Sequence, residues 1–247
     1  IFSASFYLLS RYEEYLPHVK DYKGRFLASE SIAFKSGFLE SPIVDIWAHK
    51  FKKLLLKYFP ELIFIDKNPK IHTLVNAGFP LFYKNKGVLR TCIAYLDDLI
   101  KFNLKNIFNR TSVLLGFRKD PYNTFNWIIN TVKKSKNKLT VFFLLGDSKN
   151  YQESLNSHKS SLKLLIKNIA DYQEIGLLFS FDALQSLMVQ NEEKEKIEAI
   201  INRNLESSIN DEYLVSLPHN YRSLIELEVK KDFTMVYETT IGFRAST

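Results

Sequence analysis

The stretch KIHTLVNAGF, residues 70–79, contains the first predicted strand of the chain and raises the question of function. Its apolar run predicts a short buried strand, which stops at the sequence Asn76-Ala77-Gly78. In α/β enzymes, catalytic side chains stand at the C-terminal ends of such strands. This strand ends instead in an amide, a methyl group and a hydrogen atom, so no acid stands where an enzyme would place one.

Strands and helices alternate along the chain from this point. Because strands that alternate with helical stretches form parallel βα units, this part of the chain predicts an α/β fold, as a barrel or an open sheet. The predicted strands are 71–76, 139–145, 175–180, 213–216 and 233–237. The predicted helices are 88–109, 123–136, 159–172, 182–204 and 217–227.

The N-terminal part of the chain is predicted to be helical. Apolar residues at helical spacing predict an amphipathic helix within 3–16, which Pro17 ends. A second amphipathic helix is predicted within 41–60, where Ser41 suits the N-cap and Pro42 suits the first helical position.

A polar, proline-containing break at 65–70 is the best candidate for a domain boundary. We therefore expect a small helical N-terminal region at 1–66 and an α/β domain at 67–247. A chain of 247 residues is long enough for one large domain or two smaller ones, with a sizeable core.

The composition is ordinary for a globular protein, with 46% hydrophobic and 25% charged residues. No run of 18 apolar residues occurs, so we expect no membrane span. The net charge of +7 comes largely from lysines scattered along predicted helices, whereas nucleic-acid binding needs basic residues on one face. We therefore expect no nucleic-acid partner.

The single cysteine, Cys92, excludes an internal disulfide and any zinc site built on several cysteines. We interpret it as a core thiol on a helix. Low cysteine usage favours a reducing compartment, so we expect a cytoplasmic location. The chain begins at Ile1 rather than at Met, which indicates a fragment and leaves a lost signal peptide open.

Other candidate motifs are weak. The five histidines lack the spacing of metal ligands on one helix face, and no glycine-rich phosphate loop occurs. The adjacent carboxylates Glu13 and Glu14 should point to different faces of a helix, so we expect them to be solvated or ion-paired. The residues by themselves therefore predict only an α/β protein with a helical N-terminal segment.

Seven short phrases occur in the chain in the order FSASFYLLSRYEEYLPH (2–18), GRF (24–26), FLESPIVDIW (38–47), YKNKG (83–87), KDPYNTFNW (119–127), FFLLGD (142–147) and DFTMVYETTIGFRAST (232–247). Together they resemble polysaccharide-deacetylase-like proteins of the NodB-homology type (carbohydrate esterase family 4), in the form found in Bacteroidota polysaccharide loci. The resemblance covers nearly all of the chain, and the first and last phrases are the most specific.

The resemblance implies a distorted (β/α) barrel, truncated here because its remaining strands would follow Thr247. It also implies metal-assisted removal of an acetyl group from a sugar. In active relatives, a divalent metal, usually zinc, is held by an Asp and histidines, and a second Asp takes a proton from water. The two acids belong to a phrase that ends the first barrel strand.

In this chain the family positions are occupied by other residues. The resemblance places the base at Asn76 and the metal-binding Asp at Gly78, and it places a metal-binding His at Leu178. An amide cannot accept a proton at neutral pH, and the other two residues offer no ligand atom. Arg244 matches the family arginine that orients the catalytic acid. We therefore expect no intact catalytic residue, no bound metal and no other cofactor.

Three functions remain open on these grounds. The first is a catalytically degenerate homologue in carbohydrate metabolism that binds a polysaccharide, an acetylated oligosaccharide or a partner protein. Its cleft would be lined by aromatic residues, with plain core packing as their alternative role. The second is an active deacetylase that has recruited other ligands such as His72, Asp182 or Asp211. The third is a structural module of a polysaccharide biosynthesis complex. The cleft aromatics are Phe79, Phe82, Phe179 and Phe181.

Overall fold

The computed structural model describes residues 1–65, 70–135, 137–146 and 160–247. The chain divides into two compact units. The first unit holds Ile1–Pro69, Glu212–Ser223 and Asp232–Thr247, and the second holds Lys70–Asp211 and Leu224–Lys231. The domain boundary between residues 66 and 67 stays a prediction, because compactness alone does not define a domain.

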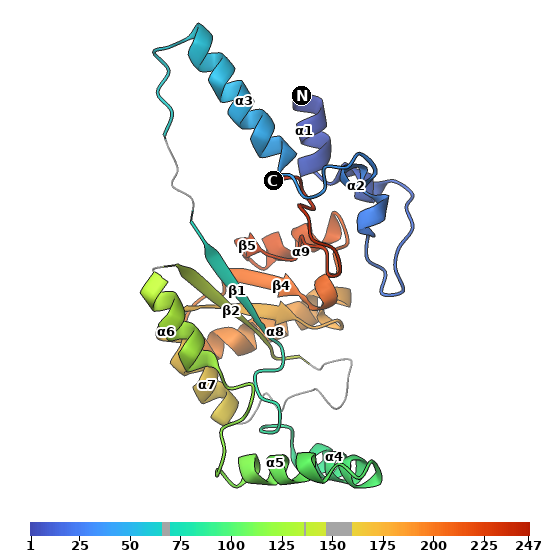
Figure 1. The fold of residues 1–247 in the computed structure, drawn as a ribbon, viewed down its shortest axis with the longest axis vertical. Coiled ribbons are helices and arrows are strands. Elements are labelled where there is room, and N and C mark those ends of the chain that lie inside the picture. The colour runs from blue at the N-terminus through green and yellow to red at the C-terminus, as the bar shows by residue number, and fades with distance from the viewer. Residues whose placement is uncertain (66–69, 136, 147–159) are drawn as a thin grey trace. The chain divides into compact units, whose positions relative to one another are not determined.

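The second unit is built on a sheet that curls into half a barrel (Figure 1). The strand order follows the sequence, and the first four strands pair with their neighbours in parallel, as the βα alternation predicts. The α/β class is thereby confirmed. The strands are β1 (His72–Ala77), β2 (Lys138–Leu144), β3 (Glu174–Phe179), β4 (Ser207–Asn210) and β5 (Lys231–Asp232).

Helices cover one face of this sheet and form the main core with it. Alternate residues of the central strands, such as Phe143, Leu177 and Phe179, are almost completely buried on this face. They pack with apolar residues of the helices, including Ile166 and Ile197. The covering helices are α6 (Phe125–Ser135), α7 (Ser160–Ala170) and α8 (Leu187–Ile201), the last preceded by the short 3-10 helix η3 (Ala183–Gln185).

The predicted helix over 88–109 is two helices, α4 (Val88–Ile100) and α5 (Leu104–Leu114). Phe102 takes a left-handed backbone, with φ of 51°, and ends the first helix. Asn103 then begins the second, because its side chain accepts a hydrogen bond from the Asn106 amide at 3.2 Å. The continuous apolar spacing concealed this break.

Two of the five predicted strands were misplaced. The fourth strand lies at Ser207–Asn210 rather than at 213–216, where residues 211–213 form the 3-10 helix η4. All four residues of β4 are buried although most are polar, so hydrophobicity gave no signal for this strand. The last strand is only Lys231–Asp232, instead of 233–237.

The first unit contains short helices and loops. The predicted helix over 3–16 stops early, because Arg11 takes a left-handed backbone with φ of 54°. Pro42, rather than Ser41, occupies the N-cap of the long helix, and its side chain makes no capping bond. The elements are α1 (Phe2–Leu9), η1 (Tyr12–Tyr15), η2 (Ala28–Glu30), α2 (Ile32–Lys35) and α3 (Ile43–Tyr58), with α9 (His219–Glu226) shared between the two units. No helix within the described ranges is long and apolar enough to cross a bilayer.

Candidate ligand-binding site at the end of the first strand

A tight polar turn ends β1 at the position where the sequence raised its question. The side-chain oxygen of Asn76 accepts a hydrogen bond from the amide of Gly78 at 2.9 Å. This is an Asx-type turn, in which a side chain replaces a backbone acceptor. The side chain of Asn76 therefore has a structural role at the position where the resemblance would place a base.

The three positions that the resemblance assigned to lost catalytic groups lie together. A Cβ atom built on Gly78 would lie 3.1 Å from Cδ2 of Leu178 and 3.3 Å from Oδ1 of Asn76. Leu178 belongs to β3, two strands from β1, and is 2% exposed. Residues 100 positions apart thus meet at the C-terminal ends of parallel strands, where α/β proteins place ligands.

A cavity of about 570 Å³ lies elsewhere, but one of about 430 Å³ opens directly beside this turn. Its wall on the β1 side includes Asn76, Gly78 and Phe79, and its opposite wall includes Tyr122 and Thr124. Apart from the Asn76 amide and two hydroxyls, its lining side chains are apolar or aromatic. Such a site offers ring faces for stacking together with a few hydrogen-bonding groups.

Asp120 fixes the two walls of this cavity to one another. Its carboxylate accepts hydrogen bonds from the backbone amides of Phe82, Tyr83 and Lys84, at 2.8, 2.9 and 3.1 Å. It also accepts the amide of Tyr122 at 3.1 Å. Two of the family phrases, YKNKG and KDPYNTFNW, are therefore joined by one buried carboxylate.

The donor atoms at this position do not fit a zinc ion. Zinc sites use about three nitrogen, sulfur or carboxylate ligands. The converging groups here are one amide oxygen, a glycine and the methyl group of Leu178. Among the described residues, no three His, Cys, Asp or Glu side chains lie close enough together to hold a metal.

The residues considered as replacement ligands are spread over the sheet. His72 is the first residue of β1, and its ring lies 2.8 Å from the Thr140 hydroxyl. Asp182 follows β3 and Asp211 follows β4, at the opposite ends of the parallel strands. A strand of this length separates its two ends by about 17–20 Å, so His72 cannot share a metal with either acid.

The four aromatic residues that were predicted to line a cleft lie in different surroundings. Phe79 lines the cavity, and Phe82 packs edge-on against Tyr122 with ring centroids 5.0 Å apart. Phe179 is fully buried in the core, so core packing, the alternative role given for these aromatics, applies to it. Phe181 is half-buried after β3. The sequence reasoning missed Tyr122, although its phrase KDPYNTFNW was already noted.

Arg244, the arginine that the resemblance singled out, lies in the first unit and pairs with Glu14. Its guanidinium donates two nearly parallel hydrogen bonds to that carboxylate, at 2.9 and 2.8 Å, and a third to the Val236 carbonyl. Arg11 also pairs with Glu14 at 2.8 Å and with Glu13 at 2.7 Å. The two most specific phrases of the resemblance therefore meet in one buried ion-pair network.

The two adjacent glutamates, Glu13 and Glu14, both belong to this ion-pair network. They are ion-paired and buried rather than solvated, because the helix breaks at Arg11 and both fall in a 3-10 turn. Burial by itself would raise the pKa of Glu14, but the hydrogen bonds and charges of Arg244 and Arg11 outweigh burial and lower it. Glu14 thus remains ionised to lower pH than an exposed glutamate.

A second buried acid, Glu193, joins the ends of β2 and β3. Ser180 donates its hydroxyl to this carboxyl at 2.5 Å and its amide at 3.1 Å. Gly146 passes so close that an added Cβ would lie 1.9 Å from Oε1 of Glu193, which explains the glycine. Burial raises the pKa of Glu193, and the bonds from Ser180 only partly oppose this.

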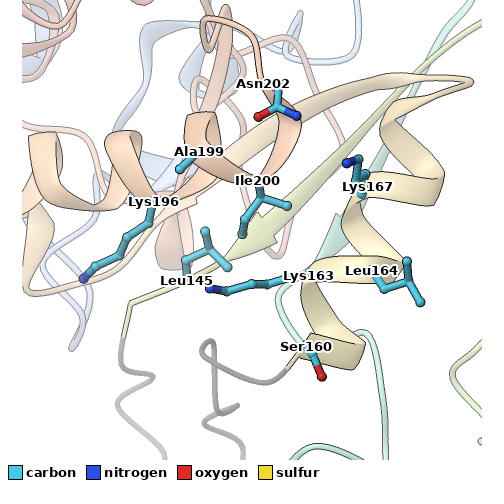
Figure 2. Close-up of a pocket in the computed structure, with 9 residues that line it drawn as sticks. All are labelled: Leu145, Ser160, Lys163, Leu164, Lys167, Lys196, Ala199, Ile200 and Asn202. Carbon is cyan, nitrogen blue, oxygen red and sulfur yellow. The ribbon is translucent and has the colours of Figure 1, made fainter.

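The cavity of about 570 Å³ lies between α7 and α8 (Figure 2). Three lysines line it, and Figure 2 shows Lys163 extending from α7 toward Leu145 at the end of β2. Lys167 and Lys196 are the other two. All three are exposed, and no buried polar group points into the space, so we assign it no ligand.

Comparison with known proteins gives one result, over the N-terminal quarter. Residues 1–60 match the model of a family described as a family of unknown function (DUF7033). No curated protein and no solved structure matches the chain. The matched segment includes Arg11 and Glu14, the partners of Arg244.

Two assignments from the sequence change in the structure. Cys92 lies on a helix as predicted, but it is exposed rather than in the core. The fold class is α/β with a curled parallel sheet, whereas the deacetylase type of barrel stays a prediction.

Proposed function

We propose that this protein is a catalytically degenerate homologue of polysaccharide deacetylases that binds a sugar chain at the end of β1. The convergence of Asn76, Gly78 and Leu178 at one point supports this proposal. The resemblance aligned them from two separate phrases, and a wrong alignment would not be expected to bring them into contact. Their chemistry favours loss of both the metal and the base.

The cavity beside this turn supports sugar binding rather than an empty remnant. Sugar rings present apolar C–H faces and a rim of hydroxyl groups. Phe79 and Tyr122 are 38% and 49% exposed, so their rings are available for stacking. The Asn76 carboxamide and the Thr124 hydroxyl offer hydrogen-bonding groups to the rim.

The test is binding of acetylated amino-sugar oligosaccharides, measured by calorimetry and by ligand-observed NMR. Tyr122→Ala should weaken binding at least about tenfold if its ring stacks on the sugar. Tyr58→Ala is the matched control, because Tyr58 is also exposed, at 66%, and lies on α3 in the other unit. Equal binding by both variants, or no binding by the wild type, would refute the proposal.

A zinc measurement separates this proposal from an active enzyme with relocated ligands. The protein is purified without chelator, analysed for metal and titrated with zinc while acetate release is assayed. We expect less than one equivalent of zinc and no acetate. Stoichiometric zinc with acetate release would show that ligands other than the converged positions are used.

A further inference from the structure

A helical hairpin, residues 85–119, leaves the second unit beside the candidate site and returns to it. It contains α4 and α5, and its two ends are tied together by Asp120, which binds the amides of residues 82–84. The hairpin thus extends away from the sheet of the second unit, and Asp120 holds its two ends together (Figure 1). Neither the sugar-binding proposal nor the ion-pair network uses it.

The two helices of this hairpin face each other through polar groups. Asp98 accepts hydrogen bonds from Arg110 at 2.6 Å and from Asn106 at 2.9 Å, and both charged residues are buried. The Tyr95 and Thr111 hydroxyls lie 2.8 Å apart across the helices. The contact between the two helices therefore includes a buried ion pair and two paired hydroxyl groups.

The apolar residues lie on the outer surface instead. On a soluble helix, residues at i, i+4 and i+7 spacing normally form the stripe that faces a core. Here each of these side chains is more than half exposed, and contiguous exposed patches of this kind mark binding surfaces. The stripe residues are Leu89, Leu96 and Ile100 on α4, Leu104 and Phe108 on α5, and Leu115 directly after α5.

The charge of the hairpin indicates what covers these stripes. Residues 85–119 contain seven basic residues and two acidic ones. Both acids are already paired, Asp98 with Arg110 and Asp97 with Lys101 at 2.8 Å. Exposed leucine, isoleucine and phenylalanine beside lysine and arginine are typical of helices that lie in the interface of an anionic bilayer.

We propose that the α4–α5 hairpin docks onto a lipid surface that carries anionic headgroups. The apolar stripes enter the boundary between headgroups and acyl chains, while basic side chains such as Lys105 and Lys119 contact the headgroups. Docking of the hairpin places the candidate sugar site close to the membrane surface, because the hairpin and the sugar site both adjoin the backbone segments that the Asp120 carboxylate binds. This proposal does not depend on sugar binding.

The test is flotation of the intact chain with vesicles of phosphatidylcholine alone and of phosphatidylcholine with phosphatidylglycerol. We expect binding to the anionic vesicles only, falling as salt rises from about 0.1 M to about 0.5 M. The double variant Ile100→Glu with Leu104→Glu should bind about tenfold less. Both residues are highly exposed, at 77% and 68%, so the fold should tolerate the change.

Matched controls place equal changes outside the hairpin. Met188→Glu with Ile225→Glu alters residues that are 70% and 74% exposed, and it should leave vesicle binding unchanged. Lys105→Glu should weaken binding, whereas Lys134→Glu, the same charge change on α6, should have a much smaller effect.

Three results would overturn the proposal. The first is equal binding to neutral and anionic vesicles, or binding to neither. The second is equal loss of binding in the hairpin and control variants. The third is concentration-dependent self-association, measured by light scattering, that Ile100→Glu with Leu104→Glu abolishes, since it would show that a second copy of the chain covers the stripes.

Discussion

Replacing Glu14 by Gln should strongly destabilise the first unit. The carboxylate accepts three charged hydrogen bonds, from Arg11 at 2.8 Å and from Arg244 at 2.9 and 2.8 Å. Both partners in the Glu14–Arg244 pair are at most 5% exposed. Removing one partner of a buried ion pair costs about 3–5 kcal/mol, because the other charge stays buried without compensation. Gln keeps one acceptor oxygen, so we expect a loss of about 3 kcal/mol.

Urea unfolding followed by fluorescence measures this loss in the correct part of the chain. Trp47 lies in the first unit and Trp127 in the second, so a Trp127→Phe background leaves a signal from the first unit only. Lys35→Met is the control, because it breaks the more exposed Lys35–Glu30 pair of the same unit, and it should change stability by less than about 0.5 kcal/mol. A loss below about 1 kcal/mol for Glu14→Gln would refute the reasoning.

The pH dependence of the same variant provides a second check. The pKa of Glu14 is lowered in the folded chain, so its contribution to stability is present above its unfolded pKa, near 4.5. That contribution is lost as the pH falls through the lower folded pKa. The stability difference between wild type and Glu14→Gln should therefore shrink as the solution is made more acidic.

Three further changes probe the second unit. Asp120→Ala should leave four backbone amides without an acceptor, cost about 2–4 kcal/mol and speed hydrogen exchange at residues 82–84, as read by NMR. The pKa of Glu193 is raised in the folded chain, so the stability that this carboxyl contributes is lost as the pH rises. In urea melts, Glu193→Gln should therefore become more stable relative to wild type between about pH 4 and about pH 8. A stability difference between the two proteins that does not change with pH would contradict this. Gly146→Ala should cost about 1–3 kcal/mol by calorimetry, since its methyl group would overlap Glu193, and an unchanged Tm would show that the acid moves aside.

The sequence predicted those parts of the fold in which hydrophobic pattern and burial agree. β1, β2 and β3 begin within one residue of their predicted starts, because each carries a clear apolar run. Those of β2 and β3 are the core, whereas β1 is only half-buried and its Leu74 is 40% exposed. β4 was missed because Ser207 and Ser208 are buried polar residues, whose environment depends on tertiary contacts. The break between α4 and α5 was missed because one left-handed residue, Phe102, leaves the helical spacing almost intact.

The sequence predicted where the candidate site lies but not all of the residues that form it. Asn76 and Gly78 were found because they end an obvious strand, and Leu178 was found through the resemblance. The role of Tyr122 depends on Asp120, whose four amide partners come from two segments that no local pattern connects. In the same way, the pairing of Glu13 and Glu14 with distant arginines cannot be read from their own neighbourhood.

The link between Glu14 and Arg244 joins residues 230 positions apart. At ribosomal rates of about 5–20 residues per second, the glutamate is made roughly 10–50 seconds before its partner. Throughout that interval the nascent first unit has a carboxylate that is destined for burial and lacks its principal cation. The first unit therefore cannot be completed until the strands β1 to β4 have all been synthesised.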